Sequence, residues 1–197
     1  MTSADFISVY PEADPALINK VLCRYSEKRL PHVLGCTAEA CRLADLYGID
    51  TDMAFNAALL HDVTKNLSFD RQLQLCDIYD IVDKDFLRES PAVLHAYTGA
   101  EIAFYEFGQC DEAARAIRFH TSGRAGMSEL EKIIYLADII EPSRNFEGVD
   151  ELRRAAAENT DRAMYLSLRS TVKHLEQNGS TVFYRTLEAL DYFEKLI

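Results

Sequence analysis

The sequence predicts an all-α protein, and three observations support that fold class. Apolar residues recur at helical spacing along nearly the whole chain. No stretch shows sustained apolar and polar alternation followed by a hairpin-type turn, so we expect a strand content near zero. A chain of 197 residues with 48% hydrophobic content can bury a sizeable core as one domain.

The first two expected helices both carry histidine. One runs from about His32 to Tyr47, and Gly48 stands where a left-handed cap is usual. The next begins at the N-cap pair Asp50-Thr51 and reaches His61 and Asp62 near its end, directly after an apolar run. The expected apolar stripe of the earlier helix comprises Leu34, Ala38, Cys41 and Leu46.

Two further helices each deliver one histidine. Ser90 caps a helix that opens with Pro91, carries His95 in its early turns and stops at Gly108. Asp111 caps the following helix, which brings His120 to its C-terminal end, just before a Thr-Ser-Gly turn. Both histidines therefore lie near helix ends.

The last helix of the core carries a carboxylate. Ser128 and Glu131 form a capping box at its start, and Pro142 ends it. Its apolar run is broken by Asp138. An unpaired carboxylate on such a surface costs several kcal/mol or shifts its pKa until it is neutral. Asp138 therefore needs a partner.

The remaining segments, about 151–177 and 181–196, also read as helices and are separated by Asn178-Gly179. They carry no ligand pattern. We expect a single domain over residues 1–197, with a motif-bearing core at about 29–144 and a helical extension at about 150–197. The extension is expected to cover the core or to form a homodimer face.

The composition limits the classes of molecule that the protein can bind. A net charge of −11 without a basic cluster argues against nucleic acid, whose phosphates are contacted by Lys and Arg. Small phosphorylated substrates stay possible, because bound divalent ions can attract phosphate into an acidic protein. No apolar run approaches the about 20 residues of a membrane span, and the first residues lack a signal-type pattern, so we expect a cytoplasmic protein. The five cysteines, an odd number without a Cys-x-x-Cys pair, are expected to be reduced and mostly buried.

Four of the five histidines and two aspartates form one ordered series. Imidazole and carboxylate are ligands of iron, manganese, zinc and nickel, so the series predicts a metal site gathered from several helices. Salt bridges from Lys65, Arg118 or Arg144 to the aspartates are the structural alternative, but they do not explain four accompanying histidines. The predicted ligands are His32, His61, Asp62, His95, His120 and Asp138.

The series and its surroundings resemble a known family, the HD-domain metal-dependent phosphohydrolases, which form helical bundles. Five spaced blocks are similar to the YqeK-type branch of that family. The blocks are Arg29-Leu30-Pro31-His32, His61-Asp62-Val63-Thr64-Lys65, His95-Ala96-Tyr97-Thr98-Gly99-Ala100, His120-Thr121-Ser122-Gly123 and Ala137-Asp138-Ile139-Ile140-Glu141-Pro142-Ser143-Arg144. The resemblance implies symmetrical bis(5'-nucleosyl)-tetraphosphatase activity, which splits diadenosine tetraphosphate into two ADP.

The ligand count predicts two divalent transition-metal ions. His32, His61, Asp62 and Asp138 suffice for one ion, as in the minimal site of the family, and His95 and His120 would then be surplus. The resemblance implies that Asp62 bridges the ions. His32, His61 and Asp138 then serve the first ion, and His95 and His120 serve the second. Mixed nitrogen and oxygen ligation without thiolate favours iron, with manganese, nickel or zinc as alternatives.

Several side chains are expected to act on the substrate, a dinucleoside polyphosphate or nucleotide. Asp62 and Lys65 are the predicted catalytic residues, and Lys65, Thr121 and Arg144 the predicted substrate contacts. For Lys65 the alternative is an exposed lysine after a helix end. Two other functions stay open: an HD-type nucleotidase or nucleoside triphosphate hydrolase, and a non-catalytic regulatory protein that binds nucleotide.

Overall fold

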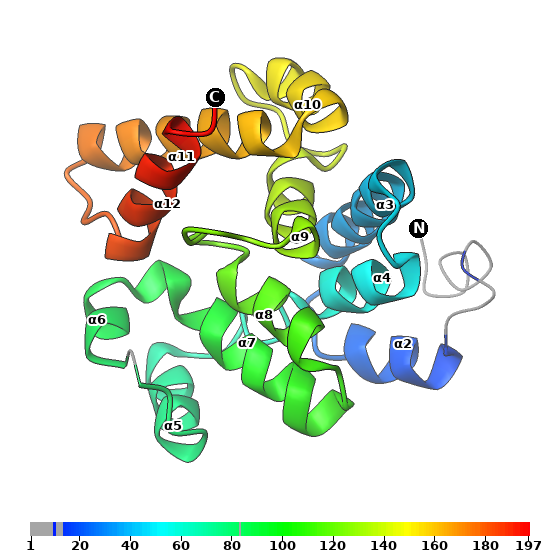
Figure 1. Cartoon of the computed structure of the whole chain (residues 1–197). Helices are drawn as coiled ribbons and strands as arrows, with labels where there is room; N and C mark the ends of the chain where they lie inside the picture. Colours follow the sequence, from blue (N-terminus) through cyan, green and yellow to red (C-terminus); the bar gives the residue numbers. More distant parts are fainter. Residues whose placement is uncertain (1–9, 11–13, 83) are drawn as a thin grey trace.

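The computed structural model describes residue 10 and residues 14–82 and 84–197; the rest of the predicted domain lies outside this description. Over the described residues it contains helices, turns and loops but no β-strand, which confirms the all-α class. In Figure 1, α9 lies between α10 and α11 on one side and α4 and α8 on the other. The helices are α2 (Pro15–Leu22), α3 (Leu30–Tyr47), α4 (Thr51–Leu60), α5 (Phe69–Ile78), α6 (Lys84–Glu89), α7 (Pro91–Phe107), α8 (Asp111–Phe119), α9 (Glu129–Ile140), α10 (Val149–Glu158), α11 (Thr160–Gln177) and α12 (Tyr184–Glu194).

Local signals set several helix ends as predicted. The Asp50 side chain accepts a hydrogen bond of 2.9 Å from the Met53 amide and caps α4. Ser128 and Glu131 form the reciprocal capping box of α9. Gly48 ends α3 with a φ of 66°, a left-handed conformation that costs glycine little.

Ser90 is the N-cap of α7 as predicted but lacks the side-chain hydrogen bond, and the predicted cap of α8 is wrong. The Ser90 side chain makes no capping hydrogen bond, because its backbone (φ −129°, ψ 65°) lies outside the extended conformation that an N-cap usually adopts. Cys110, and not Asp111, is the N-cap of α8. Asp111 instead lies in the first turn, where its charge interacts favourably with the helix dipole.

The C-terminal segment contains one helix more than expected. Asn159 divides the predicted helix at 151–177 into α10 and α11. Its backbone is extended, and its side chain accepts a hydrogen bond of 3.0 Å from the Arg162 amide, so it caps α11 instead of continuing α10. The following helix, α12, begins at Tyr184, later than the expected 181.

The buried face of α3 is rotated from the predicted stripe. Leu34 and Cys41 are buried, but Ala38 is exposed and Leu46 is 50% exposed. The reason is that α4 and α9 both pack against α3, so its apolar face follows the two neighbours together. The buried positions include Val33, Cys36, Ala40 and Leu43.

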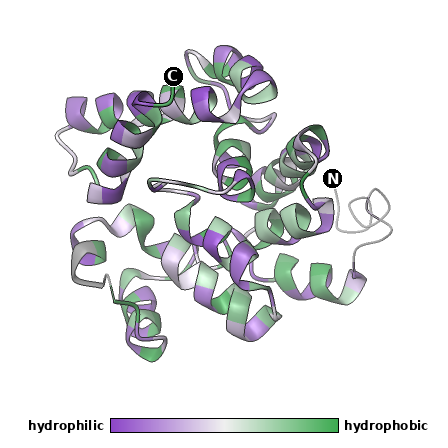
Figure 2. Cartoon of the chain, in the orientation of Figure 1, coloured by the Kyte–Doolittle hydropathy of each residue, from purple (hydrophilic) through white to green (hydrophobic). Residues whose placement is uncertain are grey.

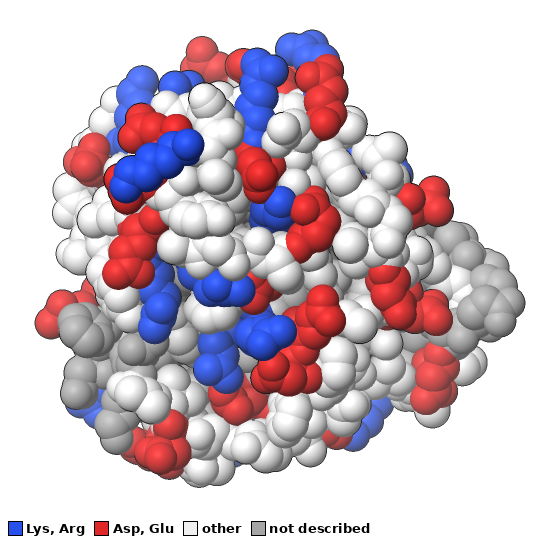
Figure 3. Space-filling model, viewed as in Figure 1, with Lys and Arg blue, Asp and Glu red and all other residues white. Residues whose placement is uncertain are grey.

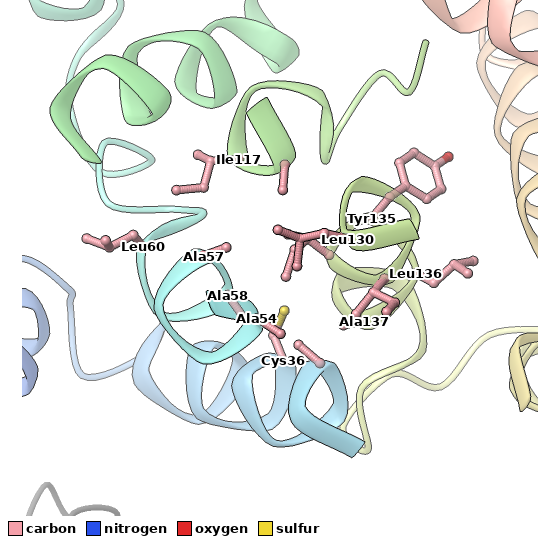
Figure 4. Packing of buried hydrophobic residues seen from close by; sticks show 14 of the residues in the cluster. Cys36, Ala54, Ala57, Ala58, Leu60, Ile117, Leu130, Tyr135, Leu136 and Ala137 are labelled. Atoms are coloured by element: carbon pink, nitrogen blue, oxygen red, sulfur yellow. The ribbon is translucent and has the colours of Figure 1, made fainter. Parts of the chain in front are cut away.

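Small residues bring the ligand-bearing helices close together. Figure 4 shows Ala54, Ala57 and Ala58 of α4 between Cys36 of α3 and Leu130 of α9. Short side chains at a contact allow helix axes to approach more closely. The C-terminal ends of α4, α8 and α9 can therefore converge on one point.

The outer helices pack around this centre. A second apolar cluster joins α5 and α7 to Phe183, which precedes α12. Figure 2 shows hydrophobic residues along α4 and α9, while α10, α11 and α12 carry more hydrophilic ones. Figure 3 shows acidic and basic side chains mixed over the same face. Among the described helices, none has the length and apolar character needed to span a membrane.

All five cysteines lie among the described residues and are thiols outside any disulfide bond, as the odd count and spacing predicted. Cys36, Cys41 and Cys76 are buried and pack as small apolar side chains, whereas Cys23 and Cys110 are exposed.

Candidate metal centre

Five helices bring the six predicted ligands together. Five of the six residues are buried, and Asp138 is partly exposed. Each lies in or beside the first or last turns of its helix, where a side chain can point past the helix end. His32 lies in the first turn of α3, His61 and Asp62 directly after α4, His95 early in α7, His120 after α8, and Asp138 in the last turn of α9.

The two carboxylate oxygens of Asp62 face different pairs of histidines. Oδ2 lies 3.3 Å from Nε2 of His61 and 3.8 Å from Nε2 of His32. Oδ1 lies 3.1 Å from Nε2 of His95 and 3.8 Å from Nε2 of His120. A carboxylate placed in this way can bridge two cations.

Asp138 adds a second carboxylate to the group of ligands that contains His32. Its Oδ1 lies 3.1 Å from Nε2 of His32. Three sets of side chains each offer ligand atoms within 4.8 Å of one another. The sets are His32, His61 and Asp62; His61, His120 and Asp138; and Asp62, His95 and His120.

Hydrogen bonds on the outer ring nitrogens orient three of the histidines. Nδ1 of His61 and Nδ1 of His120 each donate to the carbonyl three residues earlier, at 2.6 Å and 2.7 Å. Nδ1 of His32 donates to Oε1 of Glu141 at 3.1 Å. Carbonyl and carboxylate oxygens only accept, so these rings carry their proton on Nδ1 and turn the Nε2 lone pair inward.

The inward lone pairs fit a bound cation. Nε2 of His32 and Nε2 of His61 are 3.4 Å apart, and Nε2 of His95 and Nε2 of His120 are 3.2 Å apart. Ligand atoms about 2.0–2.2 Å from one ion lie roughly 2.9–3.6 Å from each other. Without a cation, facing lone pairs at these separations repel. The arrangement therefore suits a divalent metal, with nitrogen and oxygen as the only ligand atoms.

The pKa values favour the metal-binding protonation states. Burial, followed by the charge of a neighbouring histidine, lowers the pKa of His61 well below its ordinary value. Burial lowers the pKa of His95 and of His120 to about 3. Burial alone would raise the pKa of Asp138, but the neighbouring His32, the other histidines and Arg144 lower it well below the usual range. Neutral imidazole and ionised carboxylate are the forms that bind metals.

The salt-bridge alternative is correct for one of the two aspartates. Arg144 donates to Oδ1 of Asp138 at 2.6 Å, as that alternative allowed. Asp62 pairs with Arg29, a residue that the sequence argument did not single out as part of the site. Arg118 pairs with Glu101 instead. These pairs do not account for the four converging histidines.

The three predicted substrate contacts lie on the solvent side of the centre. Nζ of Lys65 is 3.2 Å from both ring nitrogens of His95. Oγ1 of Thr121 is 3.3 Å from Nε2 of His95 and 3.0 Å from Nε2 of His120. Lys65 is exposed as a whole, yet partial burial of its amine and the charge of Arg29 lower its pKa to about 8. Arg144 contacts Asp138, so each of the three side chains contacts a proposed ligand.

Glu141 is a site residue that the sequence argument missed. It is 1% exposed, and besides the contact with His32 it accepts hydrogen bonds of 2.7 Å and 2.5 Å from the amide and hydroxyl of Ser143. Gly35 makes room for it, because a Cβ at that position would stand 2.8 Å from Oε2. The available signal was its place three residues after Asp138 in the last motif block. Such outer carboxylates orient metal-ligating histidines.

Thr64 holds α7 against the chain that carries Asp62. Its hydroxyl donates to the carbonyl of His95 at 2.8 Å and lies 2.9 Å from the hydroxyl of Thr98. Gly99 lies at this contact, where a Cβ would stand in van der Waals contact with the carbonyl oxygen of His61, at 3.4 Å. These contacts fix His95 relative to Asp62.

Comparison with known proteins agrees with this geometry. Residues 29–143 match the HD domain family. A protein of Bacillus subtilis named bis(5'-nucleosyl)-tetraphosphatase, symmetrical, is 38% identical over 80% of this chain and 85% of its own length. A protein of the same name from Staphylococcus aureus is 35% identical over 85% of this chain and 87% of its own.

A solved structure has the same fold. The crystal structure of a protein from Clostridium acetobutylicum, described as a predicted HD superfamily hydrolase involved in NAD metabolism, superposes with a TM-score of 0.89. The two chains are 37% identical, and the match covers 92% of this chain and 97% of the other.

Proposed function

This chain belongs to the HD domain family, and from that premise we propose that it hydrolyses diadenosine tetraphosphate symmetrically to two ADP. One observation carries the proposal: the two oxygens of Asp62 face separate histidine pairs. This placement supports a centre with two divalent transition-metal ions. The names and high coverage of the curated relatives support the substrate.

The proposed ligands divide into two sets that share one carboxylate. Asp62 would bridge the ions, His95 and His120 would complete the second site, and the first site would take His32, His61 and Asp138. The donor set of imidazole and carboxylate supports iron, with manganese, nickel or zinc as alternatives. When bound, two such ions lower the pKa of a water that serves as nucleophile and stabilise charge on the phosphate oxygens.

The chain's own residues position the substrate and balance its charge. Water adds its oxygen to the second phosphorus and releases one proton to solvent, and the bond between that phosphorus and the oxygen leading to the third phosphate breaks. The departing ADP carries the electron pair of this bond. Lys65 and Arg144 would hold phosphate oxygens beside the proposed ligands, and the Thr121 hydroxyl would donate to one of them. Arg29, beside Asp62, adds a third positive charge near the developing negative charge.

One titration tests activity and metal count together. Metal-stripped protein receives increasing equivalents of iron(II) or manganese(II), and chromatography resolves the products formed from diadenosine tetraphosphate. We expect ADP as the sole nucleotide product and a rate that levels off at two ions per chain. A plateau at one ion would contradict the two-metal centre.

The same assay separates the alternatives. Release of inorganic phosphate from mononucleotides, with the dinucleotide left intact, would identify a nucleotidase or nucleoside triphosphate hydrolase. Nucleotide binding without any turnover in metal-loaded protein would identify a regulatory protein. Location in the cytoplasm and the exclusion of nucleic acids remain predictions from composition.

The proposed homodimer has its own support and test. Apolar side chains stay exposed on and after α12, where Leu187 is 46%, Leu196 51% and Ile197 59% exposed. Pairing of two copies would remove this surface from water. Sedimentation at micromolar concentration should show a dimer, and a monomer across that range would remove this part of the proposal.

A further inference from the structure

A cavity of about 470 Å³ lies where the loop after α9 meets α10 and α11. Pockets for small ligands usually measure about 300–1,000 Å³ and combine apolar walls with a few polar groups. None of the six proposed metal ligands lines this cavity, so it is separate from the centre described above. Its walls include Ile139, Phe146, Leu152, Leu166, Ser170 and Thr171.

The cavity begins close to the metal centre. Ile139 in its wall directly follows Asp138, and Phe146 lies two residues after Arg144. Arg144 itself donates to Asp138 at 2.6 Å. Successive Cα atoms are about 3.8 Å apart, so the wall starts within one or two residues of the centre, around α9. A phosphate chain held at Arg144 would then have its terminal nucleoside beside the loop that leads to Phe146.

The loop that forms one wall is held in place by α10. Arg153 donates hydrogen bonds of 2.9–3.1 Å to three backbone carbonyls, those of Ile140, Glu141 and Arg144. Gly148, with a φ of 90°, then turns the chain into α10. A wall fixed in this way loses little conformational freedom when a ligand binds.

The chemistry of the walls favours an uncharged polar ligand. Glu147 and Glu151 offset the charges of Arg169 and Lys173, so the cavity has no strong preference for phosphate. Phe146 is 42% exposed and offers an aromatic surface on which a base can stack. Carboxylates and hydroxyls can bond the hydroxyls of a ribose. These features together describe a nucleoside site.

We propose that this cavity binds one nucleoside of the dinucleotide, with its base against Phe146. The inference rests on the proposed function and adds a subsite that anchors the substrate while the phosphate chain crosses Arg144. Substitutions in the cavity should therefore weaken binding of the dinucleotide, although the substituted residues lie outside the metal centre.

Steady-state kinetics with metal-loaded, full-length protein test the subsite. Phe146→Ala should raise KM for diadenosine tetraphosphate about tenfold, as expected for the loss of one stacking contact. Ser170→Trp should do the same by filling the cavity from an exposed position on α11. Metal content should match that of the unaltered protein in both variants.

Matched controls separate the cavity from general surface effects. Phe69 is also 42% exposed but does not line the cavity, so Phe69→Ala should leave KM unchanged. Ser180→Trp is the control for Ser170→Trp, because it makes the same change at an exposed position after α11. A second readout uses adenosine alone: in ¹⁵N spectra of the metal-loaded protein it should shift amides around Phe146 and Ser170.

The outcomes distinguish this inference from the proposed function. Unchanged KM in Phe146→Ala and Ser170→Trp, with no adenosine shifts at the cavity, would overturn the subsite while hydrolysis by the unaltered protein stood. Failure of the unaltered protein to cleave the dinucleotide would contradict the proposed function. The adenosine titration would then still decide whether the cavity binds a nucleoside.

Discussion

Asp62→Ala is expected to abolish hydrolysis and to release metal from both proposed sites. Its two oxygens face opposite halves of the centre, so one substitution removes a ligand from each. Losing one preorganised electrostatic contact typically costs about 10²–10³ in rate, and a bridging ligand should cost more. We therefore expect a fall of more than about 10³-fold, measured together with metal content by elemental analysis.

The variant should remain folded, which circular dichroism can verify. Asp62 lies beyond the end of α4, and the apolar contacts of that helix do not depend on it. Asp111→Ala is the matched control, because it removes an exposed carboxylate that pairs with Arg115 at 2.9 Å. Surface pairs of this kind contribute little to stability. Normal turnover by folded Asp62→Ala protein would show that the carboxylate serves structure alone.

Lys65→Ala is expected to lower turnover by about 10²–10³ while both metals stay bound. Lys65 is not a proposed metal ligand, but its Nζ is 3.2 Å from the ring nitrogens of His95, where it would reach the phosphate oxygens of a bound substrate. Removing the amine would take away a charge that is proposed to stabilise the transition state. Rate and metal content measured on the same sample check both parts.

Two further variants sharpen this result. Lys65→Arg keeps the positive charge and should recover part of the rate. Lys195→Ala removes an exposed lysine that pairs with Asp191, remote from the proposed ligands in sequence, and should change almost nothing. If Lys65→Ala keeps full activity with normal metal content, the phosphate-bracing role is wrong and Arg144 is the next residue to test.

Several features of the fold could be predicted because they are local. The helix class, the Asp50 cap, the capping box of α9 and the left-handed Gly48 depend on residues a few positions apart. The six side chains that converge could be named because imidazole and carboxylate interrupt apolar helical surface. Local rules failed at Asp111 and Asn159, where backbone conformation decided the helix boundary.

The chain by itself thus determined an all-α fold and the members of the cluster, since periodicity, capping and residue chemistry act over short distances. Tertiary packing alone decided which oxygen of Asp62 faces which histidines, and that Arg29 is its ionic partner. It also decided that Glu141 reaches His32, 109 residues away, through the space left by Gly35. Such contacts join segments far apart in the chain, and their geometry follows from how closely the helices pack.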